Sequence, residues 1–317
     1  MSDKPLVIST ETISDRARSW LEHRVELLSA GPGEEVFAER APEVRGLLVR
    51  TYTDVDDALL DRLPSLRVVG RAGVGLDNID VAACRARGVE VVHTPEANTQ
   101  AVVEYVFRLL TDCIRPTTRL EAAVDAETWN GLRGRLVGRR ELDELVFGVL
   151  GMGKIGRRVA RVAGAFGCRT LGNDLLEIPE PDRHGAEMVG IERLFRESDV
   201  LTIHVDGRRE NHDLVDASLL ELMKPDAILI NTSRGFVIDE PALAAHLGAR
   251  PASTALLDVH ALEPIPADSP LFGRPNARLG PHLASRTASA MERMSGVVED
   301  LWTVLEGGEP RWPAPRA

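Results

Sequence analysis

The chain has 317 residues, of which 44% are hydrophobic, so it can bury a substantial core and is long enough for two domains. Its 38 lysines and arginines are outnumbered by 49 acidic residues. The resulting net charge of −11 opposes a general affinity for nucleic acid or for an anionic membrane surface.

Cysteine usage and the N-terminus indicate the compartment. Cys84, Cys113 and Cys168 are scattered, and they predict neither a disulfide framework nor a metal-binding pair. The N-terminus lacks the apolar segment of a signal peptide, and no apolar run reaches transmembrane length. We therefore expect a soluble, cytoplasmic protein with no nucleic-acid or membrane partner.

The first part of the chain alternates short apolar runs with helix-compatible segments, which predicts βαβ units and a parallel sheet. The apolar runs lie at residues 5–9, 46–49, 66–69 and 89–92. Apolar residues at helical spacing then predict a helix from Asn98 to about Glu127, which Pro116 should end or kink. The Gly- and Arg-rich stretch at 131–140 is predicted to be a surface loop.

A second alternating series begins at Leu145 and predicts a second doubly wound domain, inserted after the first. Its six candidate strands lie at 146–150, 168–172, 200–205, 227–231, 254–259 and 277–280. The fold class is therefore α/β, with two doubly wound parallel sheets of the Rossmann or flavodoxin kind. The chain from Ala284 to about Glu306 reads as a helix, and the Gly- and Pro-rich tail is expected to be loose.

A glycine motif follows the first strand of the second series. Gly151, Gly153 and Gly156 form GxGxxG, in which the glycines permit a tight turn, close approach of a pyrophosphate and close helix packing. Asp174 lies 18 residues beyond Gly156, at the end of the next strand. A carboxylate there can bind the ribose hydroxyls and would repel a 2′-phosphate, which favours NAD over NADP. The alternative is that Asp174 only caps the next turn.

Polar residues follow three later strands of the same series. Arg234 follows AILINTS, Asp258 follows TALL and His282 follows ARLGP. Glu263 lies five residues after Asp258. Because the carboxyl ends of parallel strands share one edge of a sheet, we expect these side chains to converge.

These residue types suit the reduction of a 2-oxo acid. Arg234 can grip a carboxylate and polarise a carbonyl, His282 can donate a proton near neutral pH, and Glu263 can favour the imidazolium. Each has a plainer alternative: a structural histidine, an ion pair at a helix start, or a solvated carboxylate. A metal site at His260 and Glu263 lacks a further ligand at suitable spacing, so no metal is expected.

Several longer segments carry a resemblance to a known family. They lie at residues 49–55, 68–81, 98–106, 148–160, 223–243, 255–264 and 281–287. At these residues the chain resembles the D-isomer-specific 2-hydroxyacid dehydrogenase family, and within it most closely the 3-phosphoglycerate dehydrogenase branch. The resemblance implies a cofactor domain at 98–283, inserted into a substrate-binding domain made from 1–97 and 284–317. It also implies a homodimer formed through the cofactor domain.

The resemblance further assigns roles to individual residues. It implies that Arg234, Glu263 and His282 are catalytic and that Asp258 helps to hold the nicotinamide. It places the rest of the NAD on Gly151, Gly153, Lys154, Ile155, Gly156, Asp174 and His204. The substrate would bind at Asn98 and Arg234, and at backbone N–H groups of the loop formed by Ala72, Gly73, Val74 and Gly75.

Three further arginines suggest a second anionic group on the substrate. Arg50 and Arg71 match anion-facing positions of the phosphoglycerate branch. Arg286 stands four residues after His282, on the same face if a helix begins there. The alternative is that Arg286 is a solvated helix residue.

The sequence thus predicts an NAD-dependent enzyme that interconverts a small anionic D-2-hydroxy acid and its 2-oxo acid, such as 3-phosphoglycerate. Oxidation of phosphite by the same residue types is a further possibility within enzymes. An alternative from another class is a non-catalytic NAD(H)-sensing binding protein on the same fold.

Overall fold

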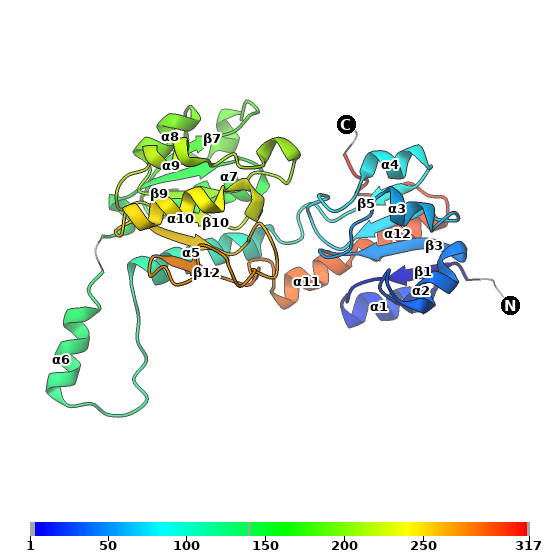
Figure 1. The fold of residues 1–317 in the computed structure, drawn as a ribbon, viewed down its shortest axis with the longest axis horizontal. Coiled ribbons are helices and arrows are strands. Elements are labelled where there is room, and N and C mark those ends of the chain that lie inside the picture. Colours follow the sequence, from blue (N-terminus) through cyan, green and yellow to red (C-terminus); the bar gives the residue numbers. More distant parts are fainter. Residues whose placement is uncertain (1–3, 139, 316–317) are drawn as a thin grey trace. The chain divides into compact units, whose positions relative to one another are not determined.

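The computed structural model describes residues 4–138 and 140–315. The chain forms two compact units, one made of Met1–Thr99 with Ser285–Ala317 and the other of Gln100–Ala284. Each unit is built on one parallel β-sheet with helices packed against it (Figure 1). The predicted α/β class with two doubly wound parallel sheets is confirmed.

The first unit contains a five-stranded sheet in the order β2-β1-β3-β4-β5, which is the flavodoxin-like order. The strands are β1 (Leu6–Ser9), β2 (Glu26–Ser29), β3 (Val44–Val49), β4 (Val68–Arg71) and β5 (Glu90–Val92). Strand β2 lies outside the apolar runs predicted from the sequence. Its residues are exposed or only half-buried, since it lies at the sheet edge, so it lacks the continuous apolar run of the central strands.

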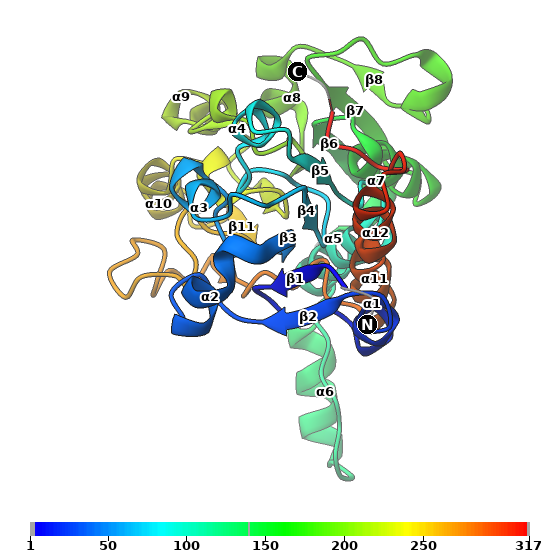
Figure 2. The same cartoon turned by 90° about the vertical axis from the view of Figure 1, so that its right-hand side faces the viewer.

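Helices cover both faces of this sheet, as Figure 2 shows. On one face lie α2 (Glu35–Arg40), α3 (Asp57–Asp61) and α4 (Val81–Ala86), and their buried side chains include Phe37, Leu60 and Cys84. On the other lie α1 (Asp15–Glu22) and α12 (Val297–Leu305), which bury Leu21 and Leu301. Burial of both faces explains why the central strands are almost wholly apolar.

Two expectations for the C-terminal segment are wrong. The predicted single helix is two, α11 (Ala288–Ser295) and α12, which meet at Gly296. The tail is not loose where the structure describes it. The Ala314 N–H donates to the Val91 carbonyl at 2.7 Å, and Pro313 forms an antiparallel bridge to Val92. Ala314 is buried, so backbone pairing to β5 outweighs the Gly- and Pro-rich composition.

The second unit contains a seven-stranded parallel sheet in the order β12-β11-β10-β9-β6-β7-β8. Counted from β6, this is a Rossmann order extended by one strand. The strands are β6 (Val146–Leu150), β7 (Arg169–Asn173), β8 (Glu187–Met188), β9 (Val200–Ile203), β10 (Ile228–Asn231), β11 (Thr254–Leu257) and β12 (Ala277–Leu279). Six of them lie within the predicted runs or one residue beyond. The two-residue edge strand β8 is too short for a sequence pattern.

Helices again pack on both faces. On one face α5 (Thr99–Ile114) and α7 (Lys154–Ala165) bury residues such as Leu110 and Val159 against the alternate β6 residues Phe147 and Val149. On the other face lie α8 (Ile191–Glu197), α9 (Ala217–Leu222) and α10 (Glu240–Ala249), which pack on Leu150 and its neighbours. No helix of the described residues is long and apolar enough to cross a membrane.

The predicted helix and loop between 98 and 140 need correction. Helix α5 ends at Ile114, two residues before Pro116, and a second helix, α6 (Ala126–Arg135), lies partly within the predicted loop. Asp125 caps α6 by accepting from the Thr128 N–H at 2.7 Å. None of the α6 residues is buried, and Figure 1 shows the helix standing away from the sheet of its own unit. Without an apolar stripe, its helical period was not visible in the sequence.

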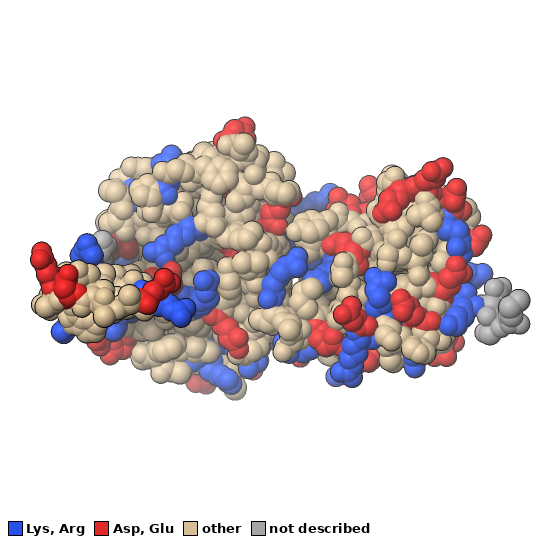
Figure 3. Space-filling model, turned by 90° about the horizontal axis from the view of Figure 1, so that it is seen from below, with Lys and Arg blue, Asp and Glu red and all other residues tan. Residues whose placement is uncertain are grey.

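The acidic net charge is not segregated on the surface drawn in Figure 3. Acidic and basic side chains are interspersed over that face, with uncharged surface between them.

Candidate active site

His282 and Glu263 form a hydrogen-bonded pair in the second unit. His282 lies three residues after β12, and its Nδ1 is 2.8 Å from Oε2 of Glu263. Both side chains are mostly buried, with 29% of His282 and 21% of Glu263 exposed. Burial alone would raise the pKa of Glu263, but the hydrogen bond and charge of His282 outweigh it, so the pKa is lowered. Glu263 is therefore an ionised partner for the imidazole at neutral pH.

Asp258 fixes the backbone around His282. Its carbonyl accepts from the His282 N–H at 2.8 Å, and its carboxylate oxygens accept from the N–H groups of Leu283 at 2.8 Å and Ala284 at 2.7 Å. His282 has a left-handed φ of 55°, which is unfavourable for a side chain that has a Cβ. Three hydrogen bonds to one residue hold it there, so Asp258 acts on His282 through the backbone.

Asp258 itself is 1% exposed, and burial is the main reason why its pKa is raised. The hydroxyl of Tyr105 on α5 also interacts with its carboxylate. The buried Asp258 carboxylate and the Tyr105 hydroxyl thus both support the loop that carries His282.

Arg234 follows β10, the strand next to β11. The Asn231 side chain donates to the Arg234 carbonyl at 2.9 Å, and Nη1 of Arg234 donates to the Ser233 carbonyl at 2.8 Å. At Gly235 an added Cβ would lie 1.8 Å from the carbonyl carbon of His260, so the two loops touch backbone to backbone. Arg234, Glu263 and His282 lie on segments that follow β10, β11 and β12, which are adjacent in the sheet.

The three glycines of GxGxxG have three different surroundings. Gly151 has φ +93°, and an added Cβ would lie 2.7 Å from the His204 backbone. At Gly156 a Cβ would lie 1.9 Å from the Gly151 carbonyl oxygen, whereas at Gly153 it would meet no atom within 4 Å. Gly153 begins the open side of the loop, where α7 starts with Lys154 and Ile155. The loop from Gly151 to Gly156, named the glycine cradle below, fits a pyrophosphate. The open space beside Gly153 lies at the N-terminus of α7.

Asp174 follows β7 and ties the glycine loop to that strand end. Its Oδ2 accepts from the Met152 N–H at 2.6 Å and its Oδ1 from the Leu176 N–H at 2.9 Å. It lines a pocket of about 330 Å³. The other lining residues are Leu175, Leu176, Glu177, Ile178, Arg183, Met188, Val189 and Gly190.

Asp174 is predicted from the sequence, whereas the apolar part of this pocket is not. Leu175 is 80% exposed and Leu176 75% exposed. The two leucines directly after Asp174 could have indicated this apolar surface from the sequence. Exposed leucines beside a concave site can pack against a flat ring.

His204 follows β9 and packs beside Gly151. Its Nε2 is 3.0 Å from the Thr202 hydroxyl, and burial lowers the pKa of His204 to about 3. The ring is therefore neutral at physiological pH and adds no charge beside the cradle.

Predicted substrate residues of the first unit lie at and after the ends of its strands. Arg71 ends β4, and an added Cβ at Gly73 would lie 1.2 Å from its Nη1, so the guanidinium covers the loop backbone. The N–H groups of Ala72 and Gly73 donate to the carbonyls of Val49 and Arg71. These two N–H groups are therefore already paired with backbone carbonyls, and the expected role of the loop from Ala72 to Gly75 in binding a substrate stays a prediction.

Arg50 and Arg286 lie close enough to affect each other. Burial is the main reason why the pKa of Arg50 is lowered, and the charge of Arg286 lowers it further. The expectation that Arg286 shares a helical face with His282 is wrong, because α11 begins only at Ala288. Asn98 precedes α5, and its Oδ1 is buried without a hydrogen-bond partner in the described part of the chain.

The metal alternative gains nothing from the geometry. Within residues 4–138 and 140–315, no group of three or more His, Cys, Asp or Glu side chains is arranged to hold a metal ion.

Comparisons with known proteins agree on one family. Residues 107–284 match the family model described as "D-isomer specific 2-hydroxyacid dehydrogenase, NAD binding domain". The chain is 34% identical to D-3-phosphoglycerate dehydrogenase of Mycobacterium leprae over 96% of its own length and 58% of that protein. It is 38% identical to (S)-sulfolactate dehydrogenase of Chromohalobacter salexigens, over 88% of this chain and 87% of that one.

A solved structure gives the same result. The glyoxylate reductase from Paecilomyes thermophila superimposes with a TM-score of 0.85 at 27% identity, covering 99% of each chain. The chain spans a little over half the length of the phosphoglycerate dehydrogenase it matches.

Proposed function

The chain belongs to the D-isomer specific 2-hydroxyacid dehydrogenase family, and we propose that it interconverts a small D-2-hydroxy acid and its 2-oxo acid with NAD. The observation that carries this proposal is the 2.8 Å hydrogen bond between His282 and Glu263. It lies in the same unit as a glycine cradle that is open at Gly153.

The proposed chemistry divides among three side chains. Arg234 binds the carboxylate of the 2-oxo acid and polarises its carbonyl group. His282 donates a proton to the carbonyl oxygen as that oxygen gains charge, and takes it back in the reverse direction. Glu263 stabilises the imidazolium form of His282, and Asp258 holds the loop that aims it.

The dinucleotide is proposed to lie on the unit formed by Gln100–Ala284. The loop from Gly151 to Gly156, with Lys154 and Ile155, would hold the pyrophosphate, and Asp174 would bind the ribose. His204 borders the same cradle. When bound, NADH supplies the hydride that reduces C2 of the substrate. The unit of the two chain ends, which carries Arg50, Arg71, Asn98 and the loop from Ala72 to Gly75, would bind the substrate.

We further propose that the substrate bears a second anionic group, bound by Arg50, Arg71 and Arg286. Burial lowers the pKa of Arg50 and the charge of Arg286 lowers it further, so an anion bound by both guanidinium groups would offset their mutual repulsion. Two of the relatives are named for phosphoglycerate and sulfolactate, which carry such a group. Replacing Arg286 by Ala should raise the KM for 3-phosphohydroxypyruvate or 3-sulfopyruvate while leaving that for glyoxylate unchanged. An equal effect on all three substrates would contradict this assignment.

The predicted homodimer through the cofactor domain is kept as a proposal, supported by α6. This helix buries none of its residues in its own unit, yet it carries Trp129 with 49% of its surface exposed. Sedimentation should show a dimer for the wild type and a monomer for Trp129→Asp. A dimer for both would contradict the role of α6.

The proposed activity is tested by NADH consumption with a panel of 2-oxo acids. The panel contains pyruvate, glyoxylate, hydroxypyruvate, 3-phosphohydroxypyruvate, 3-sulfopyruvate and 2-oxoglutarate. We expect turnover with at least one of them, and a loss of kcat of at least about 100-fold in His282→Ala. NADH binding without turnover by any member would contradict the proposal and return the NAD(H)-sensing alternative. The relatives reported above are named as enzymes and give that alternative no support.

A further inference from the structure

His260 is a buried histidine outside the proposed catalytic set, and it touches the segments that carry all three members. It lies three residues after β11 and is 6% exposed. Its backbone N–H donates to Oε1 of Glu263 at 3.1 Å. Its Nε2 is 2.8 Å from the carbonyl oxygen of Gly280, which lies two residues before His282. Its own carbonyl group packs against Gly235, the residue after Arg234.

The contact with Gly280 fixes the tautomer of the imidazole. A carbonyl oxygen can only accept a hydrogen bond, so Nε2 of His260 carries the proton and donates it. Nδ1 is then a bare acceptor, and it is buried with no hydrogen-bond partner in the part of the chain that the structure describes.

The bare Nδ1 argues against a purely space-filling role. A buried acceptor without a donor is unfavourable, and an apolar ring of the same size would fill the space without that cost. What the imidazole adds is the hydrogen bond from Nε2 to Gly280. This bond joins the loop that carries Glu263 to the strand end that carries His282.

We propose that His260 is a positioning residue that sets the distance between Glu263 and His282. Through its backbone it holds one carboxylate oxygen of Glu263, and through its side chain it holds the segment before His282. The other carboxylate oxygen is then placed 2.8 Å from Nδ1 of His282. A displacement of about 1 Å would break this alignment and slow the reaction. The inference rests on the proposed function, since it assigns a role in that reaction.

Three substitutions separate the donor from the shape of the side chain. His260→Phe keeps a ring but removes the donor. His260→Gln places an amide N–H at the same number of bonds from Cα as Nε2, so it can still reach Gly280. His260→Asn is the matched control for Gln, because its amide nitrogen stands at the position of Nδ1 and cannot reach.

The measurement is steady-state kinetics with the best 2-oxo acid of the panel, together with NADH affinity and Tm. We expect kcat to fall about tenfold in His260→Phe and His260→Asn, and to stay within about threefold of wild type in His260→Gln. KM and the NADH Kd should be unchanged in all three, because only the proton-donating pair is misaligned, and the loss of one buried hydrogen bond should lower Tm by only about 2–4 °C in His260→Phe and His260→Asn.

Equal kcat in wild type and His260→Phe would overturn the positioning role, as would equal losses in the Gln and Asn variants or a weakening of KM and NADH affinity as large as the fall in kcat. If His260→Phe does not fold, the Gln and Asn pair makes the same comparison. A wild type that turns over no substrate overturns the proposed function, and the positioning role with it. If the wild type is active and kcat does not depend on a donor at position 260, only the positioning role is overturned.

Discussion

At the scale of single residues, the three glycines of the cradle do different work because different atoms surround them. A Cβ at Gly156 would collide with the Gly151 carbonyl, whereas a Cβ at Gly153 would stand in open space. We therefore expect Gly156 to be needed by the fold and Gly153 to be needed by the proposed ligand.

This difference gives a matched pair of variants. Gly156→Ala should lower the free energy of unfolding by about 1–3 kcal/mol, because the backbone must move to admit the methyl group. Gly153→Ala should leave stability unchanged but weaken NADH binding by about tenfold, since its methyl group occupies the space for the pyrophosphate. Thermal unfolding and NADH titration of both variants are the measurements. A destabilised Gly153→Ala with normal NADH affinity would contradict this division.

Glu263 should make stability depend on pH in a defined direction. Its pKa is lowered in the folded protein despite burial, which acts the other way, because His282 stabilises the carboxylate. A lowered folded pKa means that the contribution is present above the unfolded pKa and lost as the pH falls through the folded one. Urea unfolding between about pH 7 and pH 3 should show a smaller acid-induced loss for Glu263→Gln than for the wild type. Parallel curves for the two proteins would show that the pair contributes nothing to stability.

The sequence predicted residue types better than residue contacts. Arg234, Glu263 and His282 are predicted because acids, bases and cations follow strand ends. The structure pairs Glu263 with His282, and the catalytic roles stay a prediction. The contribution of Asp258 through three backbone hydrogen bonds was not predictable, because it depends on the left-handed turn at His282. The unpaired Nδ1 of His260 likewise depends on which carbonyl its Nε2 reaches.

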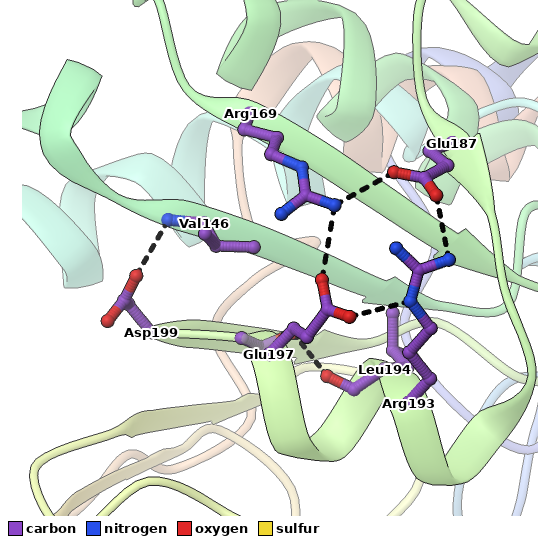
Figure 4. A network of polar contacts seen from close by, with 8 residues as sticks. Val146, Arg169, Glu187, Arg193, Leu194, Glu197 and Asp199 are labelled. Atoms are coloured by element: carbon purple, nitrogen blue, oxygen red, sulfur yellow. Dashed lines mark hydrogen bonds and ion pairs between the residues drawn. The ribbon is translucent and has the colours of Figure 1, made fainter.

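At the scale of secondary-structure elements, Asp199 joins the starts of neighbouring strands. Its Oδ2 accepts from the Val146 N–H at 2.8 Å, at the start of β6 (Figure 4). Its Oδ1 accepts from Arg140 at 2.8 Å and from Lys224 at 3.0 Å. Burial would raise the pKa of Asp199, but these hydrogen bonds outweigh it and the pKa is lowered.

Asp199→Ala should therefore lower the free energy of unfolding by about 2–3 kcal/mol, because three hydrogen bonds to one carboxylate are lost. Glu187 is the matched control. It bridges Arg169 and Arg193 in the network of Figure 4, but these side chains are about half exposed. Glu187→Gln should have a much smaller effect, because water screens surface ion pairs. Denaturant unfolding of both variants makes the comparison, and an equal loss in the two would contradict it.

Elements were predictable wherever burial imposed a pattern. The central strands of both sheets are buried on both faces, so their apolar runs were visible. The edge strands β2 and β8 and the exposed helix α6 have no buried stripe, and they were missed for that reason. The order of the C-terminal tail is not predictable from its composition, because the tail pairs with β5, which lies far away in the sequence.

At the scale of the whole molecule, each unit places its polar site residues at the carboxyl ends of its parallel strands. Arg50 and Arg71 stand at the ends of β3 and β4, and Arg234 and His282 follow β10 and β12. This arrangement supports the proposal that one unit binds the cofactor and the other the substrate. The family membership was predictable from the sequence, because several long motifs occur in the expected order. The substrate was not, because the loops that select it depend on contacts rather than on a pattern.

The proposed reaction is a direct hydride transfer to C2 of a 2-oxo acid. We would incubate the protein with the best 2-oxo acid of the panel and with NADH deuterated at both hydrogens of the nicotinamide C4, and analyse the product by mass spectrometry and chiral chromatography. We expect a D-2-hydroxy acid that carries one deuterium at C2, formed at least about 100-fold more slowly by His282→Ala. A product without deuterium, or one of the L configuration, would contradict the account.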